Sequence, residues 1–441
     1  MLHLSGVAHC LRDITSSLIS SGKFRVIQLG AAIKHDDMRP VKVHDDVIII
    51  PTEGFGTIEQ LHAVCVQNHI DLILFQSDPR FYNWLLCRDN EVRRNIPMIW
   101  YNIWDNNYYP VFNNWIFNSV DYNIPISQLT DDLIRTIAPK ANVTYMPHCV
   151  NTNIFKPLSA ADRIDFRTKH LPFTKDKFFV FWNNRNGRRK NGGTLIVAFR
   201  RFLDKIGHDK AVLLMKTDPV DHVGFNLPEI ISGFGLEGKV YINSEKFDEP
   251  TLASIYSSAD CVMNIANAEG FSMSTVESKA CGTPVICAWT GGMREQICNN
   301  IDNPTEFYGI PVFPGSSTII GSPELPWILE DQVSEQGVVD ALMEMYELGD
   351  EKRLEWGKEG REHVLRDFNW DNFNAFWPAM FEAIHNEHGS WPNKHHVKFR
   401  FENLNPDIKK YESTKEPIDL PPSYSINKEH WIKFKDSKWT K

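Results

Sequence analysis

Short apolar runs recur along this chain, and each is separated from the next by a segment with helical spacing. The run Val47–Pro51 is followed by the helical pattern of Thr57–His69 and then by the run Leu72–Gln76. A second series repeats the alternation, with runs such as Phe178–Trp182 and Ala211–Lys216. This alternation predicts parallel sheets in an α/β layout. The other apolar runs of the first series are residues 25–30, 98–104, 122–127 and 143–148.

The two series predict two domains. The chain has 441 residues, of which 42% are hydrophobic, and a prior of roughly 150 residues per domain gives two or three. The polar, proline-containing segment 148–163 reads as a linker. We therefore expect doubly wound domains over residues 1–155 and 156–370, with a ligand bound between them at the carboxyl ends of the strands. A closing helix over 371–386 and an extension over 387–441 follow.

Composition narrows the class of protein. The net charge of -9 argues against a protein that coats nucleic acid. The sequence contains neither 18 consecutive apolar residues nor a secretory signal pattern, so we expect no transmembrane segment and a cytoplasmic location. The eight cysteines form no Cys-x-x-Cys pair, and several lie in apolar runs, so we expect buried free thiols rather than disulfides.

The extension 387–441 differs from the rest of the chain, because it is rich in Pro, Lys and Ser and poor in apolar runs. Its interleaved aromatic residues, including Trp391 and Trp431, favour a partly ordered tail that packs on the body, and an arm for a partner or nucleic acid is the alternative. The nearby histidines His385, His388 and His395 lack the cysteines or spaced carboxylates of a metal site, so we expect no metal there.

The stretch Ala268–Ile286 carries the densest chemical signals. A buried strand precedes it, and Gly270 supplies a turn. A short helix follows and ends at Gly282. This helix would begin at the carboxyl end of a strand, where its unpaired amides and the positive end of its dipole form an anion site suited to phosphate.

Glu277 allows two interpretations. Ser274 and Glu277 have the spacing of a capping box, in which the two side chains close the start of a helix. Alternatively, Glu269 and Glu277 flank the anion site, and each carboxylate could accept two hydroxyl hydrogen bonds from a ligand.

The residues Glu269-Gly-Phe-x5-Glu277, followed by Lys279–Val285, resemble the E-x7-E signature of retaining glycosyltransferases with the GT-B fold, and glycosyltransferase family four is the closest match. The resemblance covers most of residues 1–385. Further segments that resemble motifs of this family, in the same order, are Val150–Pro157, Phe181–Arg185 with Lys190, Leu252–Asp260, Thr290–Gly292 with Glu295, and Phe368–Trp370.

The resemblance implies a donor site for a nucleotide-diphosphate sugar. Arg185 and Lys190 would neutralise the leaving diphosphate, which removes the need for a metal or another cofactor. Glu269 would bind the hydroxyls of the sugar, and Glu277 those of the ribose. Lys216, at the end of a strand, is either a donor ligand or a solvated strand end. The candidate donor-binding residues are Arg185, Lys190, Lys216, Gly270, Phe271, Ser272, Ser274, Thr275 and Glu277.

The acceptor side is less well marked. Ser5–Ala8 could be the family's glycine-rich turn, with Gly6 at its centre, although the strand that usually precedes this turn is missing from the sequence. Asp105 could accept a proton from the acceptor hydroxyl or orient it, and Asp78 is a weaker candidate. We expect a glycan, lipid or protein acceptor rather than nucleic acid. The alternatives to a transferase are a sugar-nucleotide epimerase of GT-B architecture and an inactive protein that binds nucleotide sugars or glycans.

Overall fold

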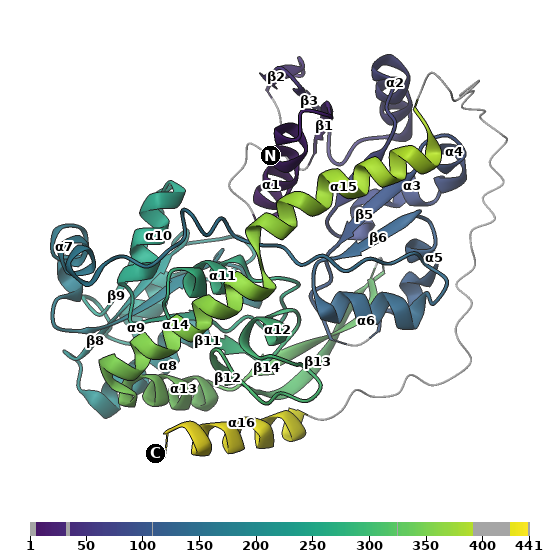
Figure 1. Ribbon diagram of the computed structural model, residues 1–441. Coiled ribbons are helices and arrows are strands. Elements are labelled where there is room, and N and C mark those ends of the chain that lie inside the picture. The colour runs from purple at the N-terminus through teal and green to yellow at the C-terminus, as the bar shows by residue number, and fades with distance from the viewer. Residues whose placement is uncertain (1–5, 32–35, 108, 324, 391–423, 440–441) are drawn as a thin grey trace. The chain divides into compact units, whose positions relative to one another are not determined.

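The computed structural model describes residues 6–31, 36–107, 109–323, 325–390 and 424–439. The chain divides into two compact units (Figure 1). Unit 1 comprises Met1–Trp104, Tyr109–His148 and Asp371–Ile418, and unit 2 comprises Asp105–Tyr108, Cys149–Trp370 and Asp419–Lys441. Most of the extension, together with Ser5 of the expected glycine-rich turn, lies outside the described residues.

Unit 2 is built on a six-stranded parallel sheet in the order β12-β11-β10-β7-β8-β9. The central strands are almost completely buried, as expected for a parallel sheet with helices on both faces. Counted from β7, the strand order is 3-2-1-4-5-6, which is the doubly wound arrangement that the sequence predicted. The strands are β7 (Phe178–Asn183), β8 (Ala211–Lys216), β9 (Val240–Asn243), β10 (Cys261–Asn264), β11 (Val285–Ala288) and β12 (Ile310–Val312).

Helices connect and cover these strands. The helix α8 (Gly192–Ile206) lies between the predicted runs Phe178–Trp182 and Ala211–Lys216, and its apolar stripe is buried. The other helices of unit 2 are α7 (Ala160–His170), α9 (Leu227–Gly233), α10 (Glu249–Ser258), α11 (Met273–Ala280), α12 (Met293–Ile297), α13 (Glu335–Glu347), α14 (Gly349–Asp367) and α16 (Tyr424–Trp439).

Two elements of unit 2 were not predicted from the sequence. The antiparallel hairpin of β13 (Pro314–Ser322) and β14 (Leu325–Val333) has a mostly exposed first strand, so its sequence lacks apolar alternation. The helix α16 packs through Trp431, whose ring lies 5.1 Å from that of Phe307 and stacks on Trp356 at 6.3 Å. This part of the extension therefore packs on unit 2.

Unit 1 contains two three-stranded sheets rather than one continuous sheet. In one sheet β3 lies between β1, to which it is parallel, and β2, to which it is antiparallel. In the other, β4, β5 and β6 are parallel. The predicted strand over 143–148 is wrong, because only Val143 forms an isolated bridge, with Asn123. The strands are β1 (Val26–Gly30), β2 (Val41–His44), β3 (Val47–Pro51), β4 (Ile73–Gln76), β5 (Met98–Asn102) and β6 (Tyr122–Pro125).

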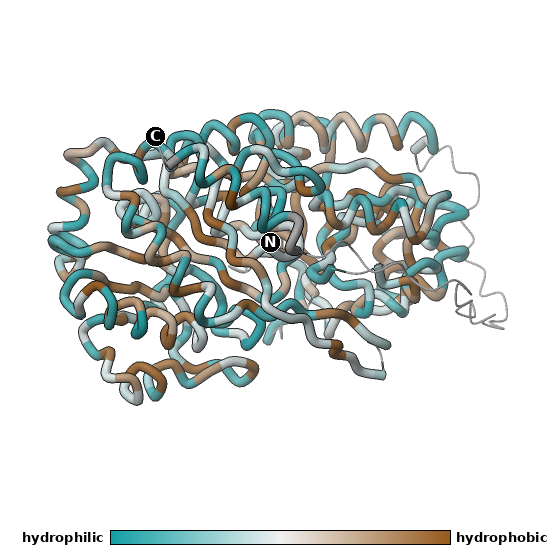
Figure 2. Tube along the Cα trace, turned by 90° about the horizontal axis from the view of Figure 1, so that it is seen from below, coloured by the Kyte–Doolittle hydropathy of each residue, from teal (hydrophilic) through white to brown (hydrophobic). Residues whose placement is uncertain are grey.

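The helices of unit 1 cover its sheets around an aromatic core. The Trp100 ring stacks between those of Phe75 and Phe117, at 5.7 and 5.6 Å. In Figure 2 the hydrophobic stretches of the chain lie mostly inside the trace and the hydrophilic residues mostly at its periphery. The helices of unit 1 are α1 (Gly6–Ser20), α2 (Ile58–Asn68), α3 (Asn83–Leu86), α4 (Asp89–Arg93), α5 (Asn114–Phe117), α6 (Gln128–Ile137) and α15 (Trp370–His388), whose first residue belongs to unit 2.

All eight cysteines are free, as predicted, and all are buried except Cys87, which is exposed. Burial raises the pKa of the thiols of Cys65 and Cys287 to about 12, so these groups stay protonated. Within the described parts of the chain, no helix combines the length and hydrophobicity needed to cross a membrane.

Candidate functional site

The candidate site lies in unit 2, where the order of the strands reverses. From β7 the chain moves outward to β8 and β9 and then returns to β10 on the other side of β7. The loops after β7 and β10 therefore diverge at the carboxyl edge of the sheet, the place where open α/β sheets bind ligands. These two loops contain the predicted residues Arg185, Lys190 and Glu269.

Lys190 and Glu269 form an ion pair between the two loops. The Nζ atom of Lys190, the last residue of a short 3-10 turn, donates to Oε2 of Glu269. Both side chains are largely buried. Burial, together with the positive charge of Arg189, lowers the pKa of Lys190 well below its usual value, and the negative charge of Asp105 opposes this shift. A bound anion would favour the charged form of this lysine.

Arg189, rather than Arg185, lies beside this pair. The Nη1 atom of Arg189 donates to the Ala268 carbonyl and lies 3.6 Å from Oε2 of Glu269. In contrast, the guanidinium of Arg185 is mostly exposed and pairs with Asp221 at 2.8 Å. Arg189, which the sequence analysis did not single out, is thus the arginine beside Glu269, and Arg185 lies beside Asp221.

Asp105 shapes the Glu269 loop. Its Oδ1 atom accepts a hydrogen bond from the Gly270 amide at 2.8 Å, and its carbonyl accepts one from the Glu269 amide at 3.0 Å. Its Oδ2 atom lies 3.3 Å from Nη1 of Arg189. Asp105 therefore holds both the loop backbone and the arginine beside it.

Gly291 lets the next loop approach Glu269 closely. Its φ is +53°, and a Cβ atom there would lie only 2.0 Å from the Glu269 carbonyl oxygen. The neighbouring Gly292 amide donates to that same oxygen at 2.8 Å. A side chain at 291 would thus displace the backbone that carries the central carboxylate.

The helix α11 begins at Met273 and is capped by Ser272, so the predicted capping box of Ser274 and Glu277 is wrong. The Ser272 hydroxyl accepts a hydrogen bond from the Thr275 amide at 3.3 Å and another from the Thr275 hydroxyl at 2.8 Å. Ser274 lies inside the helix, with its hydroxyl 3.3 Å from that of Ser272. The cap falls earlier because Ser272 is the residue with extended backbone angles before the first turn.

Glu277 instead belongs to a chain of buried polar groups. Its Oε2 atom accepts a hydrogen bond from the Tyr256 hydroxyl at 2.7 Å, and that hydroxyl accepts one from the Asn183 amide at 2.8 Å. Burial and the adjacent carboxylate raise the pKa of Tyr256 well above its usual value, so it remains a donor. Tyr256 and Asn183 therefore orient Glu277 from α10 and from the end of β7.

The other predicted residues are more scattered. The Phe271 ring packs edge-on against Phe368 at 5.8 Å. Lys216 lies at the end of β8 with its Nζ atom 6.0 Å from the centre of the Phe247 ring. In unit 1, Gly6 is the exposed first residue of α1. Asp78 caps a 3-10 turn there, with its Oδ1 atom accepting from the Arg80 amide at 2.9 Å.

Buried polar side chains missed by the sequence interpretation connect the site to the β13–β14 hairpin. The main-chain N–H of Asn267 donates a hydrogen bond to the Arg189 carbonyl at 2.8 Å, and this bond connects the two loops. Its side chain donates to Gln332 of β14 at 3.1 Å. The Asp331 carboxylate accepts from Thr290 at 2.5 Å and also from Asn107. The signal available in the sequence was the run Glu330-Asp-Gln332, which places two carboxylates and an amide in succession.

The described residues contain no group of three or more His, Cys, Asp or Glu side chains arranged to hold a metal ion. The cations that face Glu269 are instead Lys190 and Arg189.

Comparison with known proteins identifies the domain that carries this site. Residues 162–306 match the family model described as "Glycosyl transferases group 1". Residues 162–306 are thus similar to a group 1 glycosyltransferase domain. The matched segment includes Lys190, Tyr256, Glu269 and Glu277, and Asp105 and the β13–β14 hairpin lie outside it.

Two curated relatives are similar to parts of this chain. The probable sucrose-phosphate synthase of Thermosipho melanesiensis is 29% identical over 165 residues, covering 36% of this chain and 35% of the relative. The D-inositol 3-phosphate glycosyltransferase of an Arthrobacter species is 34% identical over 73 residues, or 17% of each protein. The alignments thus span about a third or less of the relatives' own lengths.

Solved structures show that the fold is the GT-B fold. Sucrose-phosphate synthase from Thermosynechococcus elongatus gives a TM-score of 0.68 at 18% identity and covers 87% of this chain and 94% of its own. The HepE protein of Anabaena, in complex with UDP and glucose, gives 0.62 at 16% identity and covers 86% and 97%. The predicted two-domain α/β architecture is therefore confirmed at the level of the fold.

Proposed function

We propose that the protein is a glycosyltransferase that moves a sugar from a nucleotide-diphosphate sugar to an acceptor hydroxyl. The observation that carries the proposal is the placement of Lys190, Arg189 and Glu269 at the point where the strand order of a group 1 glycosyltransferase domain reverses. A structural neighbour, HepE of Anabaena, is described in complex with UDP-glucose, which supports a UDP-sugar as the donor.

The diphosphate would bind to the two cations. When the bond between sugar and diphosphate breaks, negative charge develops on the leaving oxygen, and a preorganised lysine and arginine stabilise it in a site that excludes water. Without a donor, the side chains of Lys190 and Arg189 face the carboxylate of Glu269. A bound diphosphate would replace this carboxylate as the anion that faces the two cations. The amides at the start of α11 would add the positive end of its dipole. In this arrangement the protein itself supplies the positive charge, and we propose that no metal or other cofactor is needed.

The two carboxylates would bind the two sugars of the donor. Glu269, released from Lys190, would accept hydrogen bonds from the hydroxyls of the transferred sugar. Glu277, oriented by Tyr256, would accept them from the ribose hydroxyls. We propose a retaining reaction, as in glycosyltransferase family four, because of the E-x7-E spacing and the motifs that accompany it.

The acceptor would be a hydroxyl of a glycan, a lipid or a protein. Asp105 would contribute by holding the Glu269 loop and Arg189, since both of its carboxylate oxygens face those groups. The net charge of -9 argues against nucleic acid as the acceptor. The eight free cysteines are in keeping with a reducing compartment such as the cytoplasm.

The test is the release of nucleoside diphosphate from a panel of nucleotide sugars, with and without acceptor sugars. We expect one donor to be hydrolysed or transferred and to raise the melting temperature of the protein. The variants Lys190→Ala and Glu269→Ala should lose at least about a hundredfold in turnover. The matched control Lys205→Ala, on the last turn of α8, should retain full activity.

If no donor in the panel is turned over or raises the melting temperature, the proposed function is wrong. Binding of a nucleotide sugar without turnover would instead support an inactive binding protein. Full activity of either site variant would refute the assignment of the donor site.

A further inference from the structure

Two other segments of unit 2 hold the main chain of the Glu269 loop. On one side, the Asp105 carbonyl accepts a hydrogen bond from the Glu269 amide at 3.0 Å, and the Asp105 carboxylate accepts one from the Gly270 amide at 2.8 Å. On the other side, the Gly292 amide donates to the Glu269 carbonyl at 2.8 Å. The position of Glu269 therefore depends on where these two segments lie.

A single carboxylate oxygen joins the two segments. Asp331, in the strand β14, is only 2% exposed. Its Oδ2 atom accepts a hydrogen bond from the Thr290 hydroxyl at 2.5 Å and another from the side-chain amide of Asn107. Thr290 stands shortly before Gly292 in the sequence, and Asn107 stands shortly after Asp105. Asp331 thus contacts both supports of the loop through one atom.

The hairpin of β13 and β14 fixes Asp331 in turn. Ser317 of β13 is its direct partner across the hairpin, and the Ser317 hydroxyl donates to Oδ1 of Asp331 at 2.8 Å. The side-chain amide of Asn106 donates to the Leu329 carbonyl at 2.8 Å, which attaches β14 to the segment that contains Asn107. The carboxylate therefore has a fixed base from which to hold the two segments.

A carboxylate suits this position better than an amide would. Thr290, Asn107 and Ser317 present neutral donors, and hydrogen bonds to a carboxylate are shorter and stronger than bonds between neutral groups. Because Asp331 is buried, these bonds also replace the water that its charge would otherwise bind. An amide in its place would turn an NH₂ group toward the donor of Asn107.

We propose that Asp331 is a positioning residue of the donor site, which holds the Asn107 and Thr290 segments together so that Glu269 stays where it binds the hydroxyls of the transferred sugar. This role rests on the proposed function of Glu269, and Asp331 acts through its contacts rather than on the donor. The β13–β14 hairpin, which lies outside the residues that match the family model, thereby takes part in recognition of the sugar.

Loss of this support should affect the sugar end of the donor more than the nucleotide end. The diphosphate and the ribose depend on Lys190 and Glu277, which lie in the loop after β7 and in α11. The transferred sugar depends on Glu269. UDP, which lacks that sugar, should therefore bind almost as well when the Glu269 loop has moved, whereas turnover of the whole donor should fall.

An exchange of the two partners tests this role. The variant Asn107→Asp sets a second carboxylate against Asp331 and removes the hydrogen bond between the two side chains. Adding Asp331→Asn restores a hydrogen bond with donor and acceptor reversed, because the new amide can donate to the carboxylate at position 107 and to the Thr290 hydroxyl. That hydroxyl can in turn donate to the Asn267 carbonyl, which lies 3.4 Å away.

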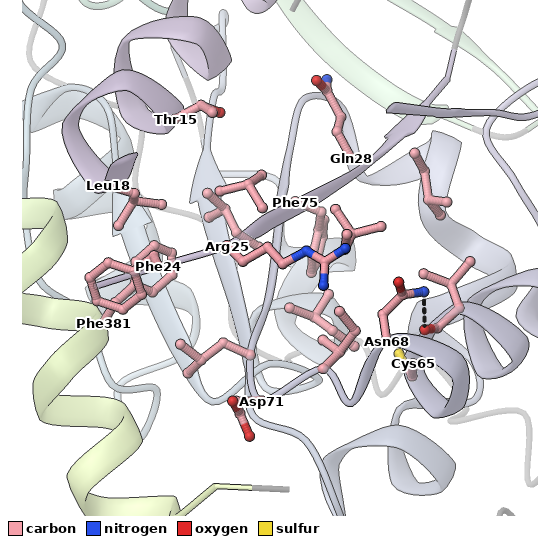
Figure 3. Close-up of a pocket in the computed structure, with 18 of the residues that line it drawn as sticks. Thr15, Leu18, Phe24, Arg25, Gln28, Cys65, Asn68, Asp71, Phe75 and Phe381 are labelled. Atoms are coloured by element: carbon pink, nitrogen blue, oxygen red, sulfur yellow. Dashed lines mark hydrogen bonds between the residues drawn. The ribbon is translucent and has the colours of Figure 1, made fainter. Parts of the chain in front are cut away.

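Hydrogen–deuterium exchange of the full chain measures the position of the loop without reference to activity. We expect Asn107→Asp to speed exchange at the Glu269, Gly270 and Gly292 amides at least about tenfold, and the double variant to return to within about threefold of wild type. Two control segments should keep their exchange rates. They are β9 of unit 2 and β4 of unit 1, a strand that borders a cavity of about 730 Å³ (Figure 3).

Turnover and nucleotide affinity form the second measurement, with UDP-glucose and UDP as probes. We expect kcat/KM for UDP-glucose to fall about tenfold in Asn107→Asp and to recover in the double variant, while the Kd of UDP stays within about threefold in all variants. The matched control is Ser317→Ala, which removes a hydrogen bond to the other oxygen of Asp331. It should lower kcat/KM by at most about threefold.

A double variant no better than Asn107→Asp, in exchange and in turnover, would overturn the proposed role of Asp331. Unchanged exchange at Glu269, Gly270 and Gly292 in Asn107→Asp would overturn it as well. Equal losses of UDP affinity and of donor turnover would show a merely structural contribution and would likewise contradict it.

Two further outcomes are distinguishable. If Asn107→Asp also speeds exchange in the control segments, Thr290→Val decides, because it removes a hydrogen bond to Asp331 without adding charge. It should speed exchange at Gly292 and lower turnover with the affinity for UDP retained, and the absence of both effects would overturn the role. If wild type turns over no donor, the proposed function is wrong, and recovery of exchange in the double variant alone decides whether Asp331 positions the loop.

Discussion

Replacing Gly291 by alanine should disturb the site through the backbone alone. The residue has a φ of +53°, and a Cβ atom would lie 2.0 Å from the Glu269 carbonyl oxygen and 2.9 Å from that of Asp105. A non-glycine residue in the left-handed region costs about 1–2 kcal/mol. Relief of the contact also breaks the hydrogen bond from Gly292 to Glu269, which contributes about 0.5–1.5 kcal/mol. The sum is a loss of roughly 1.5–3.5 kcal/mol.

The variant Gly238→Ala is the matched control. Gly238 has a φ of +72°, but no atom lies within 4 Å of its added Cβ. The left-handed backbone is therefore the only source of destabilisation in this variant. We expect Gly291→Ala to lose about 0.5–1.5 kcal/mol more, or roughly 1–6 °C more in melting temperature for a unit of this size. Donor turnover should fall about a hundredfold in Gly291→Ala, because Glu269 is displaced, and stay unchanged in Gly238→Ala. Equal stability and equal turnover of the two variants would refute the reasoning.

Three further changes probe other parts of unit 2. Tyr256→Phe removes the hydrogen bond to Glu277 and should raise the KM for the donor about 3- to 10-fold with little change in kcat; an unchanged KM would contradict the role of this pair. Burial lowers the pKa of Lys279 to about 7, so between about pH 7 and 10 the unfolded chain binds the extra proton and stability rises with pH. The free energy of unfolding of wild type relative to Lys279→Met should therefore increase by up to about 1.4 kcal/mol per pH unit in denaturant titrations, and a constant difference would disprove the shift. Trp431→Ala should release α16, seen as faster proteolysis within Tyr424–Trp439 with turnover retained, whereas unaltered proteolysis would show that Trp431 does not anchor the helix.

The sequence predicted the framework of unit 2 well because local signals and burial agree there. The strand β7 is a continuous apolar run, as a strand buried on both faces must be, and α8 combines a regular apolar stripe with a position directly after the basic loop. The placement of Glu269 in the loop before α11 and of Glu277 within that helix followed from the same pattern.

The choice among neighbouring arginines could not be made from the sequence. Arg185 and Arg189 carry the same charge within one loop, and the 3-10 turn over Arg188–Lys190 decides which one turns toward Glu269. Asn191, with a φ of +58°, completes that turn. This geometry depends on tertiary contacts such as the hydrogen bond from Asn267 to the Arg189 carbonyl, which no local pattern encodes.

The hairpin and the division of unit 1 were missed for a different reason. β13 is exposed along most of its length, so it has no apolar alternation to detect. The separation of β1 from β4 is a property of sheet order, and strand patterns predict the existence of strands more readily than the order in which they pair.

The most direct test of the donor site is a crystal structure of the protein with UDP or the nucleotide sugar that it hydrolyses. The account predicts that the diphosphate lies within hydrogen-bond distance of Lys190 and Arg189, at the carboxyl ends of β7 and β10, and that the ribose hydroxyls contact Glu277. A nucleotide bound elsewhere, or one bound here with Lys190 still paired to Glu269 and Glu277 away from the ribose, would contradict it.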